Sequence, residues 1–143
     1  MSEDSPGALP PLPVPLLIRL PAVPTSLAVI RAALRGWLPT AAVCPAAAAD
    51  VLLAVGEAAS NAVEHATKDA PGRSRDVELE VSARVGRTWI ALTVKDTGRW
   101  RPPGTPVGHR GYGRRLMHAL VDAVTITPTS HGTTVEMRKE LHT

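Results

Sequence analysis

The sequence predicts an α+β fold in which one sheet is covered on one face by helices. Two observations lead to this prediction. The periodicity of apolar residues switches along the chain and gives the order strand, helix, helix, strand, strand, loop, helix, strand, strand. The 143 residues, of which 44% are hydrophobic and 20% charged, supply material for one aliphatic core. We therefore expect a single folded domain over residues 14–141.

The N-terminal third is predicted to hold a tail, a strand and a helix. Residues 1–13 are rich in Pro, Ser and Gly, which favours a disordered or extended tail. Residues 14–20 read as a strand at a sheet edge, because Pro15 cannot donate to a ladder. Apolar residues then recur at helical spacing over residues 24–38, and Pro39 is expected to end that helix.

The middle of the chain is predicted to be a long helix followed by a hairpin. The helix is alanine-rich, runs from Pro45 to about Thr67, and has an apolar stripe through Val51, Leu52, Val55, Ala59, Ala62 and Ala66. Residues 77–82 alternate apolar and polar with a period of two, and residues 89–94 form the second strand. A turn at residues 85–87 joins these strands.

The C-terminal part begins with a segment that suits no regular element. Residues 95–113 contain five Gly and three Pro, so a loop is predicted there. A helix is expected from Arg114 to Asp122. Two strands, residues 123–127 and 133–139, then close the chain around a Pro-Thr-Ser-His-Gly turn.

The charge pattern argues against nucleic acid as a direct partner. The net charge is +3 and the sequence pI is about 9.6, but the positive charges are spread along the chain. Nucleic-acid binders more often carry a basic stripe or stacking aromatics. The densest basic group is interleaved with glycines, which suits a compact polyphosphate, and consists of His109, Arg110, Arg114 and Arg115.

The sequence also indicates the cellular compartment in which the protein is expected. Cys44 is the single cysteine, which excludes an internal disulfide and a site built from several thiolates. The N-terminus carries Glu3 and Asp4 and lacks the pattern of a signal peptide. No stretch approaches the roughly 20 apolar residues that a bilayer-spanning helix needs. We expect a cytoplasmic protein without a membrane partner.

A first candidate block lies on the long helix. Glu57, Asn61 and His65 are spaced by four, so they project from one side. An amide oxygen is a hard ligand for Mg²⁺, and a carboxylate can take a proton from an attacking hydroxyl. The alternative is a polar helix edge in water.

A second block, Asp96-Thr-Gly98, directly follows a strand. In the simpler reading it is a turn, with Asp bonding the backbone and Gly taking a positive φ. In the functional reading, the Asp96 carboxylate accepts a hydrogen bond from the exocyclic amine of a purine.

The third block, Gly108-His-Arg-Gly-Tyr-Gly-Arg114, leads into a helix. Glycines there let backbone N–H groups approach an anion, and Arg110 and Arg114 can bind phosphate oxygens. Neither a dinucleotide fingerprint nor a Walker loop is present. Each block alone is weak, but together they describe one nucleotide site.

Three segments resemble the N, G1 and G2 boxes of the GHKL (histidine-kinase-like) ATPase superfamily: GEAASNAVEHA, VKDTGRW and RGYGRRLMHALVD with GTTVEMRKEL. The nearest resemblance is to bacterial anti-sigma-factor serine/threonine-protein kinases and their actinobacterial relatives. It covers residues 14–141 and implies a Bergerat-type two-layer α/β sandwich. The sheet would be mixed and mainly antiparallel, with three helices on one face.

The resemblance also implies roles for matched residues. Glu57 would be the general base, Asn61 would hold Mg²⁺ against the phosphates of ATP, and Asp96 would accept from the adenine amine. Gly98 would let the base approach, and His65 would belong to the nucleotide site without an assigned role. Further positions would line the phosphates (Arg110, Gly111, Tyr112, Gly113) or lie near the adenine (Thr133 or Thr134).

The resemblance leaves two functions open. The first is a kinase that phosphorylates an anti-sigma antagonist and sequesters a sigma factor, with a homodimer implied. The second is an ATP-dependent binding module without phosphotransfer. It is suggested by Trp100, which stands where the G1 box usually has Gly, and by the short proline-rich lid between Gly98 and Gly108.

Overall fold

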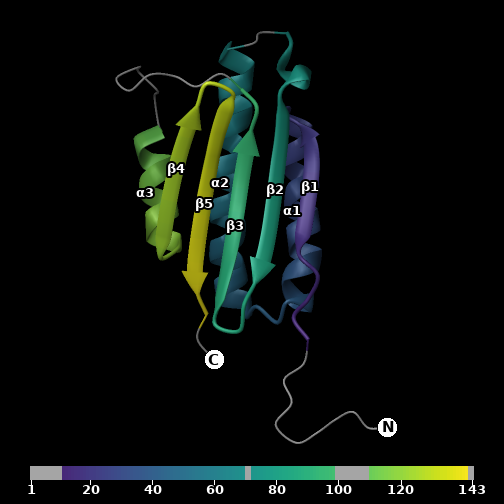
Figure 1. Ribbon diagram of the computed structural model, residues 1–143, viewed down its shortest axis with the longest axis vertical. Coiled ribbons are helices and arrows are strands. Elements are labelled where there is room, and N and C mark those ends of the chain that lie inside the picture. The colour runs from purple at the N-terminus through teal and green to yellow at the C-terminus, as the bar shows by residue number, and fades with distance from the viewer. Residues whose placement is uncertain (1–10, 70–71, 99–109, 142–143) are drawn as a thin grey trace, which may run out of the picture.

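The structure, a computed structural model, describes residues 11–69, 72–98 and 110–141, without the side chains of Asp69 and residues 110–113 (Figure 1). Most of the expected tail and the whole proline-rich lid with Trp100 lie outside the described residues. The elements follow the predicted order, with one added turn of 3-10 helix. They are β1 (Leu16–Pro21), α1 (Pro24–Thr40), α2 (Pro45–Asp69), η1 (Ser74–Asp76), β2 (Glu78–Val85), β3 (Trp89–Asp96), α3 (Arg110–Leu120), β4 (Ala123–Thr129) and β5 (Gly132–Glu140).

The strands form one five-stranded sheet in the order β1-β2-β3-β5-β4. Every pairing within the described part of the chain is antiparallel, so the expectation of a mixed sheet was wrong in that detail. The cause is the connectivity: β2–β3 and β4–β5 are hairpins, and β5 returns beside β3 in the opposite direction. β1 and β4 are the edge strands and contain Pro21 and Pro128, which lack the N–H that an inner strand needs.

The three helices cover one face of this sheet, which confirms the two-layer α+β architecture (Figure 1). On β2 and β3 every second residue points into the core, as the period-two pattern predicted. The core-facing side chains of these strands are Leu79, Val81, Ala83, Val85, Ile90, Leu92 and Val94. Met117 and Val121 anchor α3 and the turn after it, and Met137 anchors β5.

The central helix α2 packs against α1, α3 and β3. Val51, Ala54 and Val55 are fully buried on its sheet-facing side, which confirms the apolar stripe. Over Pro45–Lys68, α2 is also the one described helix that is long and apolar enough to cross a membrane, judged by length and composition alone. No such stretch was expected from the sequence, because Asp50 and Glu57 interrupt the apolar run of this helix. In the fold, these apolar residues build the core between the sheet and the neighbouring helices.

Two helix boundaries differ from the prediction. α1 continues through Pro39 to Thr40, because Pro39 lacks only its own donor and the amides of Ala41 and Val43 still reach the Leu38 carbonyl. α3 begins at Arg110, four residues earlier than expected. Intrinsic propensity is a weak prior that tertiary packing overrides, so the two glycines in the first turn do not prevent this start.

All helices of the described ranges lie on one side of the sheet (Figure 1). The opposite face is mostly polar. Arg19 Nε donates to Glu80 Oε1 at 2.9 Å, and this hydrogen bond raises the pKa of Arg19 above its ordinary value. The Trp89 indole lies between the guanidinium groups of Arg84 and Arg138, at 5.1 and 4.7 Å from the ring centroid. Such cation–π contacts are each worth about 0.5–1 kcal/mol at exposed sites.

Candidate functional site

The blocks singled out in the sequence meet at one end of the two layers. The C-terminal half of α2, the end of β3, the start of β5 and the start of α3 all lie at this end (Figure 1). α2 contacts both α3 and β3, and β3 pairs with β5. The antiparallel topology causes the convergence, because β3 ends where β5 begins.

On α2 the predicted row of polar residues is present. Glu57, Asn61 and His65 are each half-buried, while Ala58 and Ala62 beside them are buried in the core. The row therefore lies at the boundary between the core and the solvent. Such a boundary holds a polar side chain in a restricted position while leaving it accessible to a ligand.

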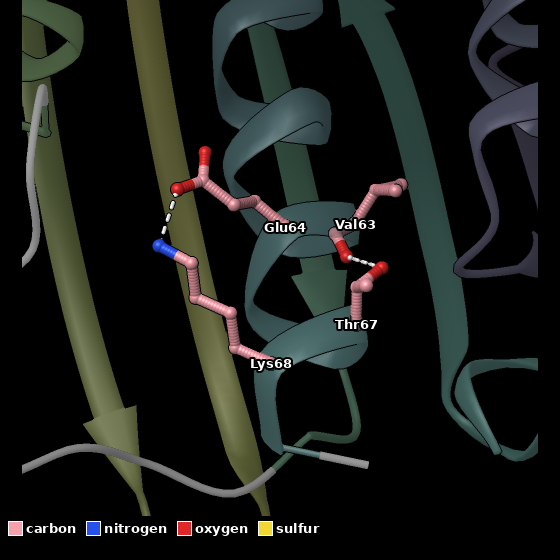
Figure 2. Close-up of polar contacts among 4 residues, drawn as sticks. All are labelled: Val63, Glu64, Thr67 and Lys68. Carbon is pink, nitrogen blue, oxygen red and sulfur yellow. Dashed lines mark hydrogen bonds and ion pairs between the residues drawn. The ribbon is translucent and has the colours of Figure 1, made fainter. Parts of the chain in front are cut away.

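The neighbouring polar residues of α2 are engaged within the helix (Figure 2). Lys68 Nζ lies 2.8 Å from Glu64 Oε1, an ion pair at i,i+4 spacing. The Thr67 hydroxyl donates to the Val63 carbonyl at 3.0 Å. These contacts stabilise the last turns of α2, next to the row formed by Glu57, Asn61 and His65.

His65 differs from these neighbours. Its Nε2 atom is buried and has no hydrogen-bond partner within the part of the chain that the structure describes. Buried polar atoms are nearly always paired, so an unpaired one calls for a ligand or a bound water. This orphaned atom, on the helix side that carries Asn61, fits a site that is completed by a ligand.

The end of β3 supplies a carboxylate. Asp96 is 8% exposed, and its Oδ1 accepts the Gly98 amide at 2.9 Å. This contact is the turn expected from the Asp-x-Gly pattern, and it fixes the orientation of the carboxyl group. The position is compatible with both readings of the block, because a carboxylate can accept several hydrogen bonds.

The structure separates the two candidate threonines of β5. Thr133 is the register partner of Asp96, and paired residues share a face, so Thr133 lies on the helix side. Thr134 pairs with Lys95 and Thr127, which are exposed on the opposite face. Thr133 is thus brought to the site and Thr134 is not, because successive residues of a strand point to opposite faces.

Gly132 also lies at this end of the sheet, although no role was predicted for it from the sequence. It has a φ of +151°, and a Cβ built on it would lie 1.8 Å from the Asp96 carbonyl oxygen. Only a residue without a side chain allows β5 to begin this close to the end of β3. The available signal was a glycine that directly precedes a predicted strand.

The described part of the third block, residues 110–114, forms the start of α3, and Gly108 and His109 lie outside the described residues. Arg110, Gly111, Tyr112 and Gly113 are helical in backbone, whereas a glycine-rich loop was expected to line the phosphates. The first amide groups of a helix lack intrahelical partners and carry a partial positive charge. This helix start lies at the same end of the molecule as Asp96 and is suited to face an anion (Figure 1).

The donor set fits a nucleotide-bound cation better than a cage made by the protein alone. Within the described ranges, no three His, Cys, Asp or Glu residues gather as a metal-binding group. Mg²⁺ is usually held by one or two protein ligands together with phosphate oxygens and water. A single amide such as that of Asn61, opposite a phosphate chain, is in keeping with that pattern.

Comparison with known proteins decides the family. A family model described as the histidine kinase-like ATPase domain matches residues 20–139. The chain belongs to this family. It is also similar to a solved structure, the RsbU and RsbW domains of Rv1364c from Mycobacterium tuberculosis, with a TM-score of 0.73 and 26% identity. The match covers 90% of this chain and 33% of the solved one, so this chain spans about a third of that protein's solved length.

These findings agree with the resemblance to the anti-sigma-factor kinase branch of the GHKL superfamily. Membership of this ATPase family implies ATP as the ligand of the site. The α+β sandwich with helices on one face is shared with the solved relative. In this chain the candidate residues of α2, β3 and β5 and the start of α3 lie toward the same end of the sheet.

Proposed function

We propose that this domain is an ATP-binding regulatory serine/threonine-protein kinase of the anti-sigma-factor type. It would phosphorylate an anti-sigma antagonist and sequester a sigma factor. The observation that carries the proposal is that Glu57 and Asn61 belong to one half-buried row, which runs from the middle of α2 toward the end of the sheet where Asp96 lies. In this arrangement Glu57 would accept a proton, Asn61 would bind a cation, and Asp96 would accept a hydrogen bond from the purine of the same nucleotide.

The adenine base binds at the end of the sheet where β3 ends and β5 begins. The Asp96 carboxylate accepts a hydrogen bond from the adenine amine, and the turn through Gly98 keeps that carboxylate oriented. The Thr133 hydroxyl, on the same face, adds a direct or water-mediated contact. A carboxylate acceptor favours adenine over guanine, since guanine presents a carbonyl oxygen where adenine has its amine.

The phosphates and the transfer step are assigned to the helices. The Asn61 amide oxygen would hold Mg²⁺, which would offset the charge of the phosphates, and the first turn of α3 (Arg110, Gly111, Tyr112, Gly113) would face their negative charge. Bound ATP supplies the γ-phosphoryl group. Glu57 accepts the proton of the partner's Ser or Thr hydroxyl as the oxygen–phosphorus bond forms and ADP leaves.

The partners follow from the proposed kinase type. We propose a sigma factor, an anti-sigma antagonist or both, in line with the similarity to an RsbW domain. A homodimer and a cytoplasmic location belong to the same proposal, as does the absence of direct nucleic-acid and membrane contacts. The charge distribution supports this last point, because the net charge of +3 is not gathered in one stripe.

Calorimetric titration tests the nucleotide site. ATP and ADP, each with Mg²⁺, are titrated into the wild type and into Asp96→Asn. Asn keeps an oxygen for the Gly98 amide but presents an amine where the carboxylate accepted a hydrogen bond. We expect micromolar-range binding by the wild type and its loss in the variant. No heat from a folded wild-type protein would contradict the proposal and favour a module that sequesters its partner without ATP.

Phosphotransfer is tested with a labelled γ-phosphate and a recombinant antagonist protein. Glu57→Gln keeps the size of the side chain but removes the proton acceptor, so label transfer should fall by at least about a hundredfold. Glu64→Gln is the matched control, because Glu64 lies on the same helix and pairs with Lys68. ATP binding without transfer by the wild type would favour the ATP-dependent binding module instead.

A further inference from the structure

The inference concerns the outer edge of β4; it rests on the homodimer of the proposed function and gives that dimer a specific interface. β4 ends the sheet on one side, beside α3 (Figure 1). An edge strand presents unpaired backbone groups that another strand can bind, and proteins commonly block such edges with prolines or charged side chains. The two edges of this sheet differ in this respect.

β1, at the other edge, is blocked. The Ala22 amide, just after β1, donates to the Val77 carbonyl at 2.8 Å, so even-numbered residues of this segment turn their backbone groups toward β2. Odd-numbered residues turn theirs outward. These outward positions include Pro21 and, directly before the strand, Pro15, neither of which has an N–H. Arg19, also on an outward position, adds a charge, so strand addition at β1 is disfavoured.

At β4 the outward positions keep their backbone groups. The Asp122 amide donates to the Arg138 carbonyl at 2.9 Å, and the Glu140 amide donates to Asp122 Oδ2, so even-numbered residues of β5 face β4. The register joins them to odd-numbered residues of β4. Even-numbered residues of β4 therefore point their backbone groups away from the sheet. Val124 and Ile126 offer both an N–H and a C=O at this edge.

The side chains at this edge also favour an added strand. β4 contains no charged residue, and its Pro128 stands near the end of the strand. The helix-facing side chains of β4, Val124 and Ile126, are only half-buried, whereas those of β2 and β3 are buried. Leu116 of α3, the helix that packs against β4, is 39% exposed. The apolar layer between the sheet and the helices is thus open beside β4.

We infer that β4 is the interface with a second copy of this chain, and that the two β4 strands pair antiparallel about a two-fold axis at Thr125. Val124 of each copy exchanges backbone hydrogen bonds with Ile126 of the partner subunit, so the two sheets become continuous. The side chains of this pair meet on the helix side and cover each other. The segment from Val124 to Ile126 is β-branched throughout and reads nearly alike in both directions, so a second copy fits it.

The position of Pro128 favours this register over its neighbour. A register centred on Ile126 would set Pro128, which has no N–H, opposite Val124 of the partner subunit and lose hydrogen bonds there. The register centred on Thr125 uses only residues that have both backbone groups. It therefore predicts which residues of the two copies lie face to face.

Sedimentation measurements test the interface through one backbone amide. The wild type, Ile126→Pro and Ile126→Ala are compared over a wide concentration range without nucleotide. Proline removes the outward amide of this position but no hydrogen bond to β5, whereas alanine removes the side chain and keeps the amide. We expect a reversible dimer for the wild type. The dissociation constant should be about tenfold higher for Ile126→Pro than for Ile126→Ala, because each copy loses a hydrogen bond.

Disulfide trapping tests the register. In a Cys44→Ser background, which lacks the single natural thiol, Thr125→Cys brings two thiols to one non-hydrogen-bonded pair with a Cα separation of about 4.5 Å. This separation suits a disulfide. Thr127→Cys is the matched control, because Thr127 is exposed on the same face but its two copies lie about 14 Å apart in this register. Mild oxidation should give a covalent dimer with Thr125→Cys only.

Several outcomes would overturn the inference. A wild type that sediments as a monomer at every concentration would reject it. A dimer that is as tight in Ile126→Pro as in Ile126→Ala, or that Thr125→Cys does not trap, would equally reject this edge. Melting temperatures show whether the variants are folded, and trapping decides alone if proline unfolds the chain. Neither experiment uses nucleotide, so failure of the interface is distinct from failure of the ATP site, which calorimetric titration measures separately.

Discussion

Gly132 lies so close to Asp96 that a Cβ on Gly132 would come within 1.8 Å of the Asp96 carbonyl oxygen. The two residues belong to neighbouring strands, and Asp96 is paired in register with Thr133, the next residue of β5. This approach fixes the end of β3 against the start of β5. The backbone that carries the Asp96 carboxylate therefore depends on a glycine in a different segment of the sequence.

Replacing Gly132 with Ala should damage both stability and binding. The added Cβ must push β5 away from β3, and a φ of +151° strains any L side chain. We expect a loss of about 3 kcal/mol or more in the free energy of unfolding, which lowers the melting temperature by roughly 10 °C. Differential scanning calorimetry measures the shift. An unchanged melting temperature would show that β5 can move at no cost.

Thr133 and Thr134 should differ in their effect on nucleotide affinity. Thr133→Val removes a hydroxyl on the face that carries Asp96, so ATP should bind about three- to tenfold more weakly. Thr134→Val is the matched control on the opposite face and should leave affinity unchanged. Calorimetric titration with ATP measures the affinities of the two variants. Equal effects would contradict the assignment of Thr133 to the site.

Lys139 should contribute more to stability than an exposed lysine. Its side chain is 18% exposed, and Nζ lies 2.9 Å from the Leu120 carbonyl oxygen and 3.3 Å from Asp50 Oδ2. It thereby joins β5 to the end of α3 and to the start of α2. Lys139→Met should cost about 1–2 kcal/mol of unfolding free energy in urea titration.

The matched control for Lys139 is Lys68→Met. Lys68 forms an exposed i,i+4 pair with Glu64, so its loss should cost no more than about 0.5 kcal/mol. Equal losses in the two variants would show that the contacts of Lys139 with Leu120 and Asp50 add nothing beyond an ordinary surface pair.

Gly56 should be replaceable with a gain in stability. It lies in the middle of α2, in a shallow groove against α1, and a Cβ there would meet nothing within 4 Å. Ala in a helix interior is favoured over Gly by about 0.5–1 kcal/mol, so Gly56→Ala should raise the melting temperature by about 2–4 °C. On α1, a Cβ at Gly36 likewise meets nothing within 4 Å, so Gly36→Ala should raise the melting temperature by a similar amount. A lower melting temperature for Gly56→Ala alone would indicate that α1 closes onto this position.

The sequence by itself determined the order of the elements, the two-layer class and the family. The stripe through Val55 and Ala62 and the alternation in β2 are local patterns with one physical cause, the burial of one face, so they can be read without the fold. The three boxes are local too, because each lies within one element and its adjoining turn. The start of α3 at Arg110 was missed because packing of one helix against another outweighs the propensity of its glycines.

Only the tertiary structure decided how those local pieces meet. A period of two says that Thr133 and Thr134 face opposite ways, but only pairing with β3 says which one joins Asp96. The requirement for glycine at position 132 depends on a backbone carbonyl more than thirty residues earlier in the chain. The unpaired Nε2 of His65 depends on what surrounds it from several elements at once. Contacts between distant segments have no local signature, so only the fold shows which of these residues lie close together.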